Sequence, residues 1–111
     1  ARLYTGPMYC KYNAVLRGGL PSSTARDAER FNSLCRGNKY VTSLHCINSC
    51  VVKLSKLQRA CKVYRGIANG VLPREFFEQD AQSGVRGAVE TGFMSTTTSR
   101  EIALSYAAGG D

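Results

Sequence analysis

The sequence predicts a single α+β domain in which helices occupy the first half and strands begin in the second. Two observations support this class. Up to Leu57, apolar side chains recur at steps of three and four residues, which is the period of amphipathic helices. Beyond Cys61, short β-branched and aromatic stretches alternate with glycine-rich links, which is typical of strands. The length of 111 residues suits one domain, with a helical part over 1–60 and a strand-bearing part over 61–111.

The first two helices are recognised by their ends. The first follows the apolar stripe of residues 9–16 and stops at Gly18. The second begins after the hydroxyl side chains of residues 22–24, which suit an N-cap, and carries Asp27 in its first turn. Gly37 supplies the C-cap of this second helix.

A third and longer helix is expected over residues 40–54. Its apolar stripe advances by four, three, four and three residues and consists of Tyr40, Leu44, Ile47, Val51 and Leu54. Polar and lysine side chains take the other faces, so one side is expected to be buried and another exposed to water. His45 lies beside the stripe, where we expect a hydrogen-bonded helix residue rather than a metal ligand.

Two strands and two short helices are expected in the second half. Residues 62–67 and 92–97 combine β-branched and aromatic side chains and predict the strands. A short helix begins at Pro73, because proline is well suited to a first helical turn. Thr98 and Glu101 are spaced as a capping box, which predicts that a last helix opens there.

The sheet that these strands would form is incomplete. An isolated pair of strands is only marginally stable in water, and complete domains pair or cover their strand edges. We therefore expect the remaining strands to lie beyond Asp111, so that residues 1–111 form a single domain without its C-terminal part.

Basic residues are concentrated in the first part of the chain. Residues 1–65 contain 12 Lys/Arg and 2 Asp/Glu, a net +10, whereas residues 66–111 contain 3 and 6, a net −3. This asymmetry leaves a basic helical nucleic-acid-binding domain as an alternative. The basic residues are scattered singly, so a solvated face is preferred and no nucleic-acid partner is expected. No apolar run approaches the roughly 18 residues of a membrane span, and no span is expected in this segment.

The five cysteines are odd in number and lack zinc-finger spacing. Small buried hydrophobes in a reducing compartment are the preferred interpretation, with one disulfide plus spare thiols as the alternative. The compartment itself stays open. Cys46 and Cys50 lie one helical turn apart, a spacing at which thiols can bind metal, but the neighbouring His45 projects about 100° away from Cys46. No metal is therefore expected.

Sequence motifs of several familiar sites are absent. The chain contains no Walker phosphate loop, dinucleotide-binding glycine pattern, serine-nucleophile elbow, zinc-finger spacing or EF-hand loop. What remains is a polar cluster on each predicted strand, VYRG at 63–66 and FMSTTT at 93–98.

These clusters carry groups that suit a nucleotide. Arg65 lies within an apolar strand, and its planar guanidinium suits a phosphate, with a structural ion pair to Glu90 as the alternative. Gly66 would let a flat ligand approach the backbone, although strand-end glycines are common. The hydroxyls that begin at Ser95 suit a ribose, although hydroxyl-rich strands are also common.

The order of these motifs resembles that of a known family. A YRG strand, then LPxxF, then a glycine-rich link into GFMSTT and a helix with ALSYA, resembles the arginine-specific mono-ADP-ribosyltransferases of the R-S-E class. YTGPMYCKYNAVLRG and KYVTSLHCINSCVVKLSKL resemble helical segments that precede the family's first active-site strand. The resemblance covers essentially the whole chain and depends on motif order, flanking helices and the 30-residue separation of Arg65 and Ser95.

The resemblance implies a fold and a site. The fold is a split, strongly bent β-sandwich with helices around an NAD cleft, of which this chain would hold the helices and first strands. Arg65 would hold NAD through its phosphate and nicotinamide-side ribose, and the Gly66 backbone would meet the nicotinamide carboxamide. Ser95 would orient the nicotinamide ribose or the Arg/Glu network, and Thr96 and Thr97 would complete that strand. Arg65 and Ser95 are thus the expected catalytic residues.

The implied reaction is that of a glycosyltransferase. NAD, or NADP instead, would lose nicotinamide and pass ADP-ribose to an arginine of an acceptor protein, without a metal. The family's third element, a Glu-x-Glu on a later strand, has no counterpart in Glu75 with Glu78, or in the isolated Glu90 and Glu101. We therefore expect little or no transfer by this chain alone. A noncatalytic module that binds NAD or ADP-ribose is the alternative.

Overall fold

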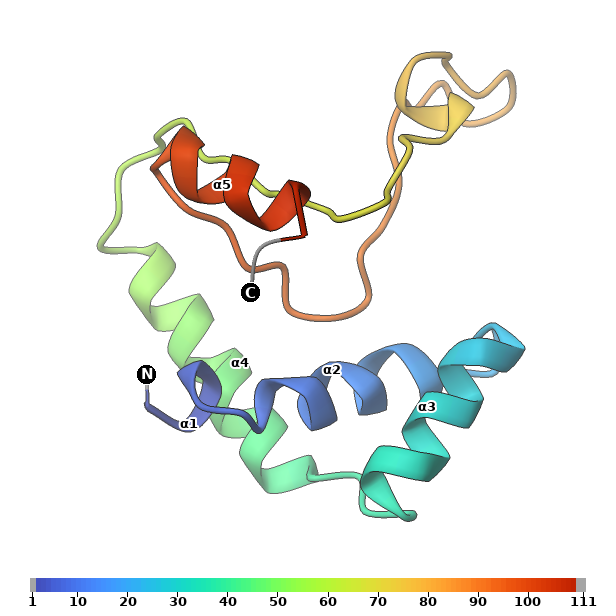
Figure 1. Ribbon diagram of the computed structural model, residues 1–111, viewed down its shortest axis with the longest axis vertical. Helices are drawn as coiled ribbons and strands as arrows, with labels where there is room; N and C mark the ends of the chain where they lie inside the picture. The colour runs from blue at the N-terminus through green and yellow to red at the C-terminus, as the bar shows by residue number, and fades with distance from the viewer. Residues whose placement is uncertain (1, 110–111) are drawn as a thin grey trace. The chain divides into compact units, whose positions relative to one another are not determined.

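The computed structural model describes residues 2–109 and divides into two compact units (Figure 1). The first, here the helical unit, comprises Ala1–Arg59 with Thr91–Phe93, and the second, the loop unit, comprises Ala60–Glu90 with Met94–Asp111. In chain order the elements are α1 (Arg2–Thr5), α2 (Tyr9–Gly18), α3 (Ala25–Cys35), α4 (Val41–Ser55), the 3₁₀ turn η1 (Arg74–Phe76) and α5 (Arg100–Ala107).

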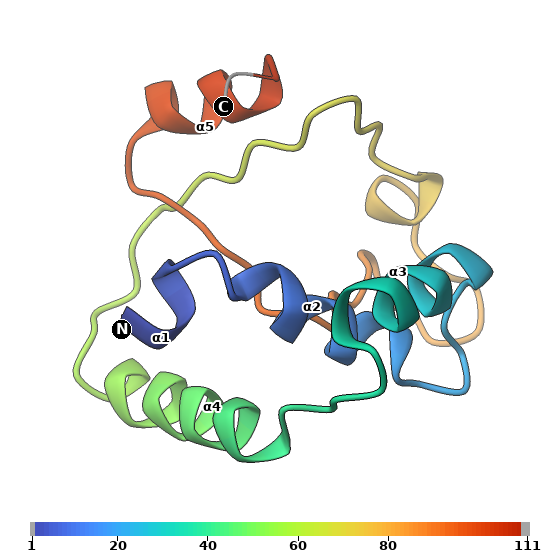
Figure 2. The same ribbon diagram turned by 60° about the horizontal axis from the view of Figure 1, so that its bottom comes forward.

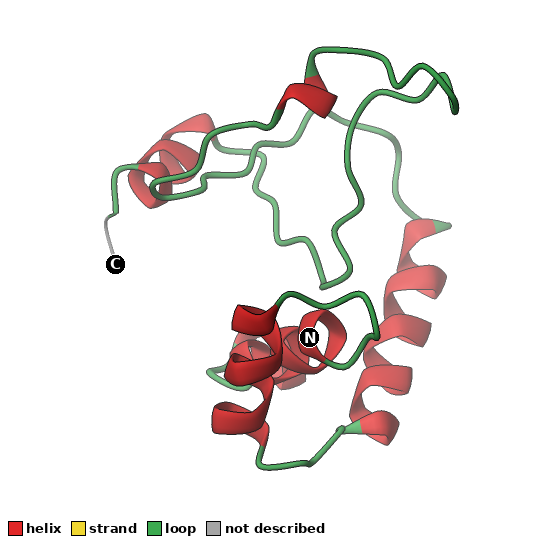
Figure 3. Ribbon diagram, turned by 90° about the vertical axis from the view of Figure 1, so that its right-hand side faces the viewer, coloured by secondary structure: helices red, strands yellow, loops and turns green. Residues whose placement is uncertain are grey.

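The predicted α+β class, with the first strands of a split β-sandwich, is wrong. Over residues 2–109 the structure contains helices and loops but no strand (Figure 3). The two predicted strands meet only at one antiparallel bridge, in which Tyr64 and Thr97 exchange backbone hydrogen bonds of 2.8 and 2.9 Å.

Side chains of the helical unit bind the backbone of Phe93, at the start of the second predicted strand. The Phe93 N–H donates to Asn13 Oδ1 at 2.8 Å, and the Phe93 carbonyl accepts from the Tyr4 hydroxyl at 3.3 Å. Both backbone groups that a neighbouring strand would need are therefore already bonded to helix-borne side chains.

The three longer helices expected in the first half are confirmed. Thr24 is the N-cap of α3, and its hydroxyl oxygen accepts from the Asp27 N–H at 3.2 Å. The C-cap of α3 is Arg36 rather than Gly37, with a left-handed φ of 49°. Gly18 allows α2 and α3 to approach closely, because a Cβ built there would lie 2.6 Å from the Phe31 Cβ.

The core of the helical unit is small. Tyr12 is 2% exposed, and its ring meets that of Tyr40 edge to face with centroids 5.7 Å apart. Ile47 is the one described residue of α4 that is buried. The prediction that the whole apolar stripe of this helix is buried is therefore correct only at Ile47.

The expectation that the cysteines are buried is correct only for Cys35. All five thiols are free, Cys10 is half-buried, and Cys46, Cys50 and Cys61 are exposed. The Cys35 thiol donates to the Lys11 carbonyl at 3.5 Å, and burial raises its pKa, partly offset by the Lys11 charge.

In the loop unit, local hydrogen bonds rather than a core define the conformation. Of its described residues, only Ala103 in α5 is buried. The N-cap of α5 is Ser99, whose hydroxyl accepts from the Ile102 N–H at 3.4 Å, so the predicted capping box of Thr98 and Glu101 is wrong by one residue. No helix in the described part of the chain is long and apolar enough to span a bilayer.

Candidate functional site

Arg65 and Ser95 lie together in the loop unit. The Arg65 guanidinium donates through Nη1 to the backbone carbonyl of Ser95 at 3.0 Å, across 30 residues of sequence. The bridge between Tyr64 and Thr97 explains this meeting, since its antiparallel register places the following residues of one segment opposite the preceding residues of the other. The contact uses the Ser95 backbone, so it places the residue without depending on its hydroxyl.

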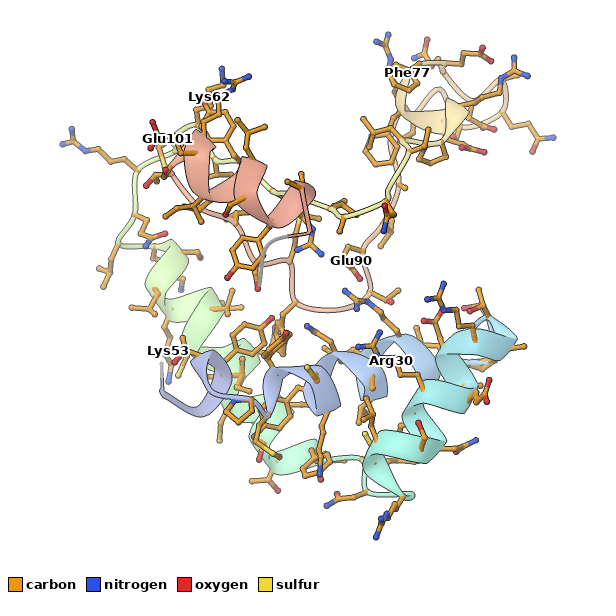
Figure 4. All side chains as sticks on the ribbon, in the orientation of Figure 1. Arg30, Lys53, Lys62, Phe77, Glu90 and Glu101 are labelled. Carbon is orange, nitrogen blue, oxygen red and sulfur yellow. The ribbon has the colours of Figure 1, made fainter. Side chains whose placement is uncertain are left out.

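Glu90 is a second partner of the guanidinium. Its Oε2 lies 3.8 Å from Arg65 Nη2, and the side chains are 29% exposed for Arg65 and 23% exposed for Glu90 (Glu90 is labelled in Figure 4). At this distance the partly exposed pair is a weak ion pair, which contributes about 0.5 kcal/mol. The structural pairing considered as an alternative for Arg65 is therefore present, but it is weak enough for an anion to compete with it.

Gly66 is explained by packing against α5. A Cβ at this position would collide with the Ala103 carbonyl oxygen and would lie 2.9 Å from the Ala107 backbone nitrogen. The close approach that the sequence suggested for a ligand is thus made by a helix of the same unit. This contact is sufficient to require glycine, whether or not a ligand also approaches.

The hydroxyl-bearing residues differ in what surrounds them. Ser95 and Thr96 are exposed, whereas Thr97 is half-buried and its Oγ1 accepts from the Ser99 N–H at 3.1 Å. Thr97 therefore helps to start α5 as well as forming the bridge with Tyr64. Exposure leaves the Ser95 and Thr96 segment accessible to a ligand beside the guanidinium.

One neighbour of the site was missed by sequence reasoning. Lys62 Nζ lies 5.5 Å from the centroid of the Tyr64 ring, a cation–π distance. The signal was available, because residues two apart in an extended segment share a face, as Lys62 and Tyr64 do. The site segment therefore carries two cations, at positions 62 and 65, and the Glu90 carboxylate contacts the second of them.

Two further carboxylates of the loop unit, Glu78 and Glu101, have local roles. Both carboxylate oxygens of Glu78 accept hydrogen bonds of 2.9 Å from Nη2 of Arg74, four residues earlier in the chain. Glu101 lies in the first turn of α5, where a negative charge is favourable. Neither of these contacts involves Arg65.

The cavities of the helical unit are formed by other residues. One hollow of about 400 Å³ lies among side chains of α2 and α4 and residues 91–93, and a smaller one of about 50 Å³ lies between α2 and α3. No group of three or more His, Cys, Asp or Glu residues is arranged to hold a metal ion within the described residues. No protein-family model, curated protein or solved structure matches this chain.

Proposed function

We propose that the chain binds NAD at Arg65 and Ser95 and is the NAD-binding part of an NAD(P)+:protein-arginine mono-ADP-ribosyltransferase. The observation that carries the proposal is the 3.0 Å hydrogen bond from the Arg65 guanidinium to the Ser95 carbonyl. It joins the two motifs on which the family resemblance depends. The motifs meet in the structure, although residues 2–109 contain no sheet to join them.

The proposed roles follow from what each group offers. Arg65 uses one of its five N–H donors on Ser95, and a diphosphate would take others by displacing the carboxylate of Glu90. The hydroxyls of Ser95 and Thr96 would bind the ribose next to nicotinamide. Transfer would break the bond between that ribose and nicotinamide through an oxocarbenium-like state and form a bond to the guanidinium of an acceptor arginine.

Binding and transfer are separable in this proposal. In the family, one carboxylate of the Glu-x-Glu element stabilises the positive charge that develops on the ribose in the transition state. The other carboxylate assists the guanidinium of the acceptor arginine. No such element occurs in the sequence. The expected behaviour of this chain is therefore NAD binding with little or no transfer to an arginine acceptor.

Calorimetric titration with NAD tests the proposal. Arg65→Lys should weaken binding by about tenfold or more, because an ammonium cannot reproduce a bidentate contact. Arg86→Lys, at an exposed arginine of the same unit, is the matched control and should bind as the parent does. Ser95→Ala removes the hydroxyl but keeps the carbonyl that accepts from Arg65, so any loss of affinity reports the hydroxyl alone.

Glu90→Gln distinguishes a ligand-binding arginine from a purely structural one. If Glu90 competes with the diphosphate, removing its charge should tighten NAD binding. If Arg65 serves only to pair with Glu90, the variant should leave affinity unchanged, and no binding by any variant would refute the proposal. Binding of ADP-ribose as tight as that of NAD would instead favour the noncatalytic module, and a steeply salt-dependent affinity for duplex RNA or DNA would favour the nucleic-acid alternative.

A further inference from the structure

Helix α4 presents two exposed thiols that the proposed NAD site does not use. Cys46 and Cys50 both lie inside this helix, which is continuous from Val41 to Ser55 (green in Figure 2). Both are free and exposed, whereas the buried residue of the helix is Ile47. The preferred interpretation of these cysteines as core residues therefore fails, and their spacing needs another account.

Helix geometry places the two thiols on one face. Residues four apart are stacked one turn above the other, with Cβ atoms about 5–6 Å apart. Two sulfur ligands of a tetrahedral ion, each at about 2.3 Å, lie about 3.8 Å from each other. The sulfur–sulfur distance can be shorter than the Cβ–Cβ distance when the two Cβ–Sγ bonds point toward each other. Both sulfurs can then bind one ion without unwinding the helix.

The same geometry disfavours a disulfide between these residues. A disulfide needs Cβ atoms about 3.5–4.5 Å apart, which is closer than an intact helix holds them. A disulfide between Cys46 and Cys50 is therefore not expected as long as α4 remains helical. A metal ion, unlike a disulfide, fits between them.

The surroundings select the kind of ion. Helix α4 contains no Asp or Glu, so it offers no carboxylate ligands, which hard cations such as Mg²⁺ and Ca²⁺ prefer. Thiolate pairs prefer soft ions, among them Cu⁺, Zn²⁺, Cd²⁺ and trivalent arsenic. The remaining coordination positions of such an ion would face water.

We propose that Cys46 and Cys50 form a two-thiolate site for one soft, thiophilic cation. With Cd²⁺ as the ion, the two thiols lose two protons and two S–Cd bonds form, without oxidation or reduction. With phenylarsine oxide, two As–S bonds form and the arsenic oxygen leaves as water with both thiol protons. The chemistry needs no oxidant, and it is independent of NAD binding at Arg65.

The test uses the reduced 111-residue chain and two probes. Phenylarsine oxide should give one adduct per chain that a dithiol removes and a monothiol does not, and Cd²⁺ should give ultraviolet thiolate-to-metal absorption at one equivalent. Cys46→Ser and Cys50→Ser should each weaken Cd²⁺ binding by about a hundredfold, since a second tethered ligand raises affinity by about that factor or more. Cys61→Ser, at an exposed cysteine outside α4, is the matched control and should retain parental binding.

The serine variants and the thiol treatments give results that either support or overturn the two-thiolate site. Circular dichroism verifies that each serine variant keeps its helices, which is expected at exposed positions. Equal binding by the parent and both α4 variants would overturn the proposal, as would loss of binding in Cys61→Ser. An arsenical adduct that a monothiol strips as readily as a dithiol would also overturn it, because single thiols hold arsenic only weakly.

Discussion

Asn13 should be one of the most destabilising positions in the helical unit when replaced by alanine. This side chain is 7% exposed and makes two hydrogen bonds, accepting from the Phe93 N–H at 2.8 Å and donating to the Tyr4 hydroxyl at 3.2 Å. The Tyr4 hydroxyl in turn donates to the Phe93 carbonyl at 3.3 Å. Asn13 thus holds residues 91–93 against the helices, directly and through Tyr4.

The magnitude follows from these contacts. Each lost hydrogen bond costs about 1 kcal/mol net, and a buried N–H left without an acceptor costs about 1–3 kcal/mol. Because Phe93 is only half-buried, water can replace part of the loss. We expect Asn13→Ala to lower the free energy of unfolding by about 2 kcal/mol and the melting temperature by about 10 °C.

Urea unfolding followed by circular dichroism measures the loss, and amide exchange at Phe93 locates it. Asn32→Ala is the matched control, because Asn32 is exposed on α3 and alanine favours helix, so its stability should change by less than about 0.5 kcal/mol. Tyr4→Phe should cost about 1 kcal/mol and should not add fully to Asn13→Ala, since the two side chains share one network. Full additivity, or a loss for Asn13→Ala no greater than for the control, would refute this account.

Two further predictions concern the loop unit. Gly66→Ala should displace α5 and reduce the helical circular dichroism signal, because the added Cβ would meet the Ala103 carbonyl; an unchanged α5 by NMR chemical shifts would contradict the packing described here. The pKa of Asp80 is lowered by the Ser83 backbone N–H, then by the Ser83 hydroxyl and the Gln82 N–H. Because the folded pKa lies below the unfolded one, this stabilisation is complete above the usual aspartate pKa and is lost as the pH falls through the lowered value. Titration of the Ser83 amide shift should show the loss, and Asp80→Asn should abolish the titration.

The helices could be predicted from the sequence because their determinants are local. The stripe of α3, the hydroxyl of Thr24 and the glycine after α2 all act within a few residues of the structure they specify. The strands could not be predicted in the same way. The Phe93 N–H is bonded to a side chain 80 positions earlier, and nothing in the helical pattern around Asn13 indicates that contact.

The candidate site was partly within reach of sequence reasoning. The sequence placed Arg65 and Ser95 on neighbouring segments, and the structure contains a contact between them. A single bridge takes the place of the expected sheet. The packing role of Gly66 could not be predicted, because a glycine after an extended segment has the same appearance whether a ligand or a helix approaches it. Only the position of α5 distinguishes these cases.

The route of the chain between the two units has a mechanical consequence. The backbone passes from one unit to the other at residue 59, again after Glu90, and once more before Met94. A protease that cuts the exposed loop near Gln82 would therefore leave two fragments that still share the helical unit, because the C-terminal fragment carries Phe93 and the N-terminal fragment carries Asn13. The nicked protein should elute as one species under native conditions and separate only in denaturant.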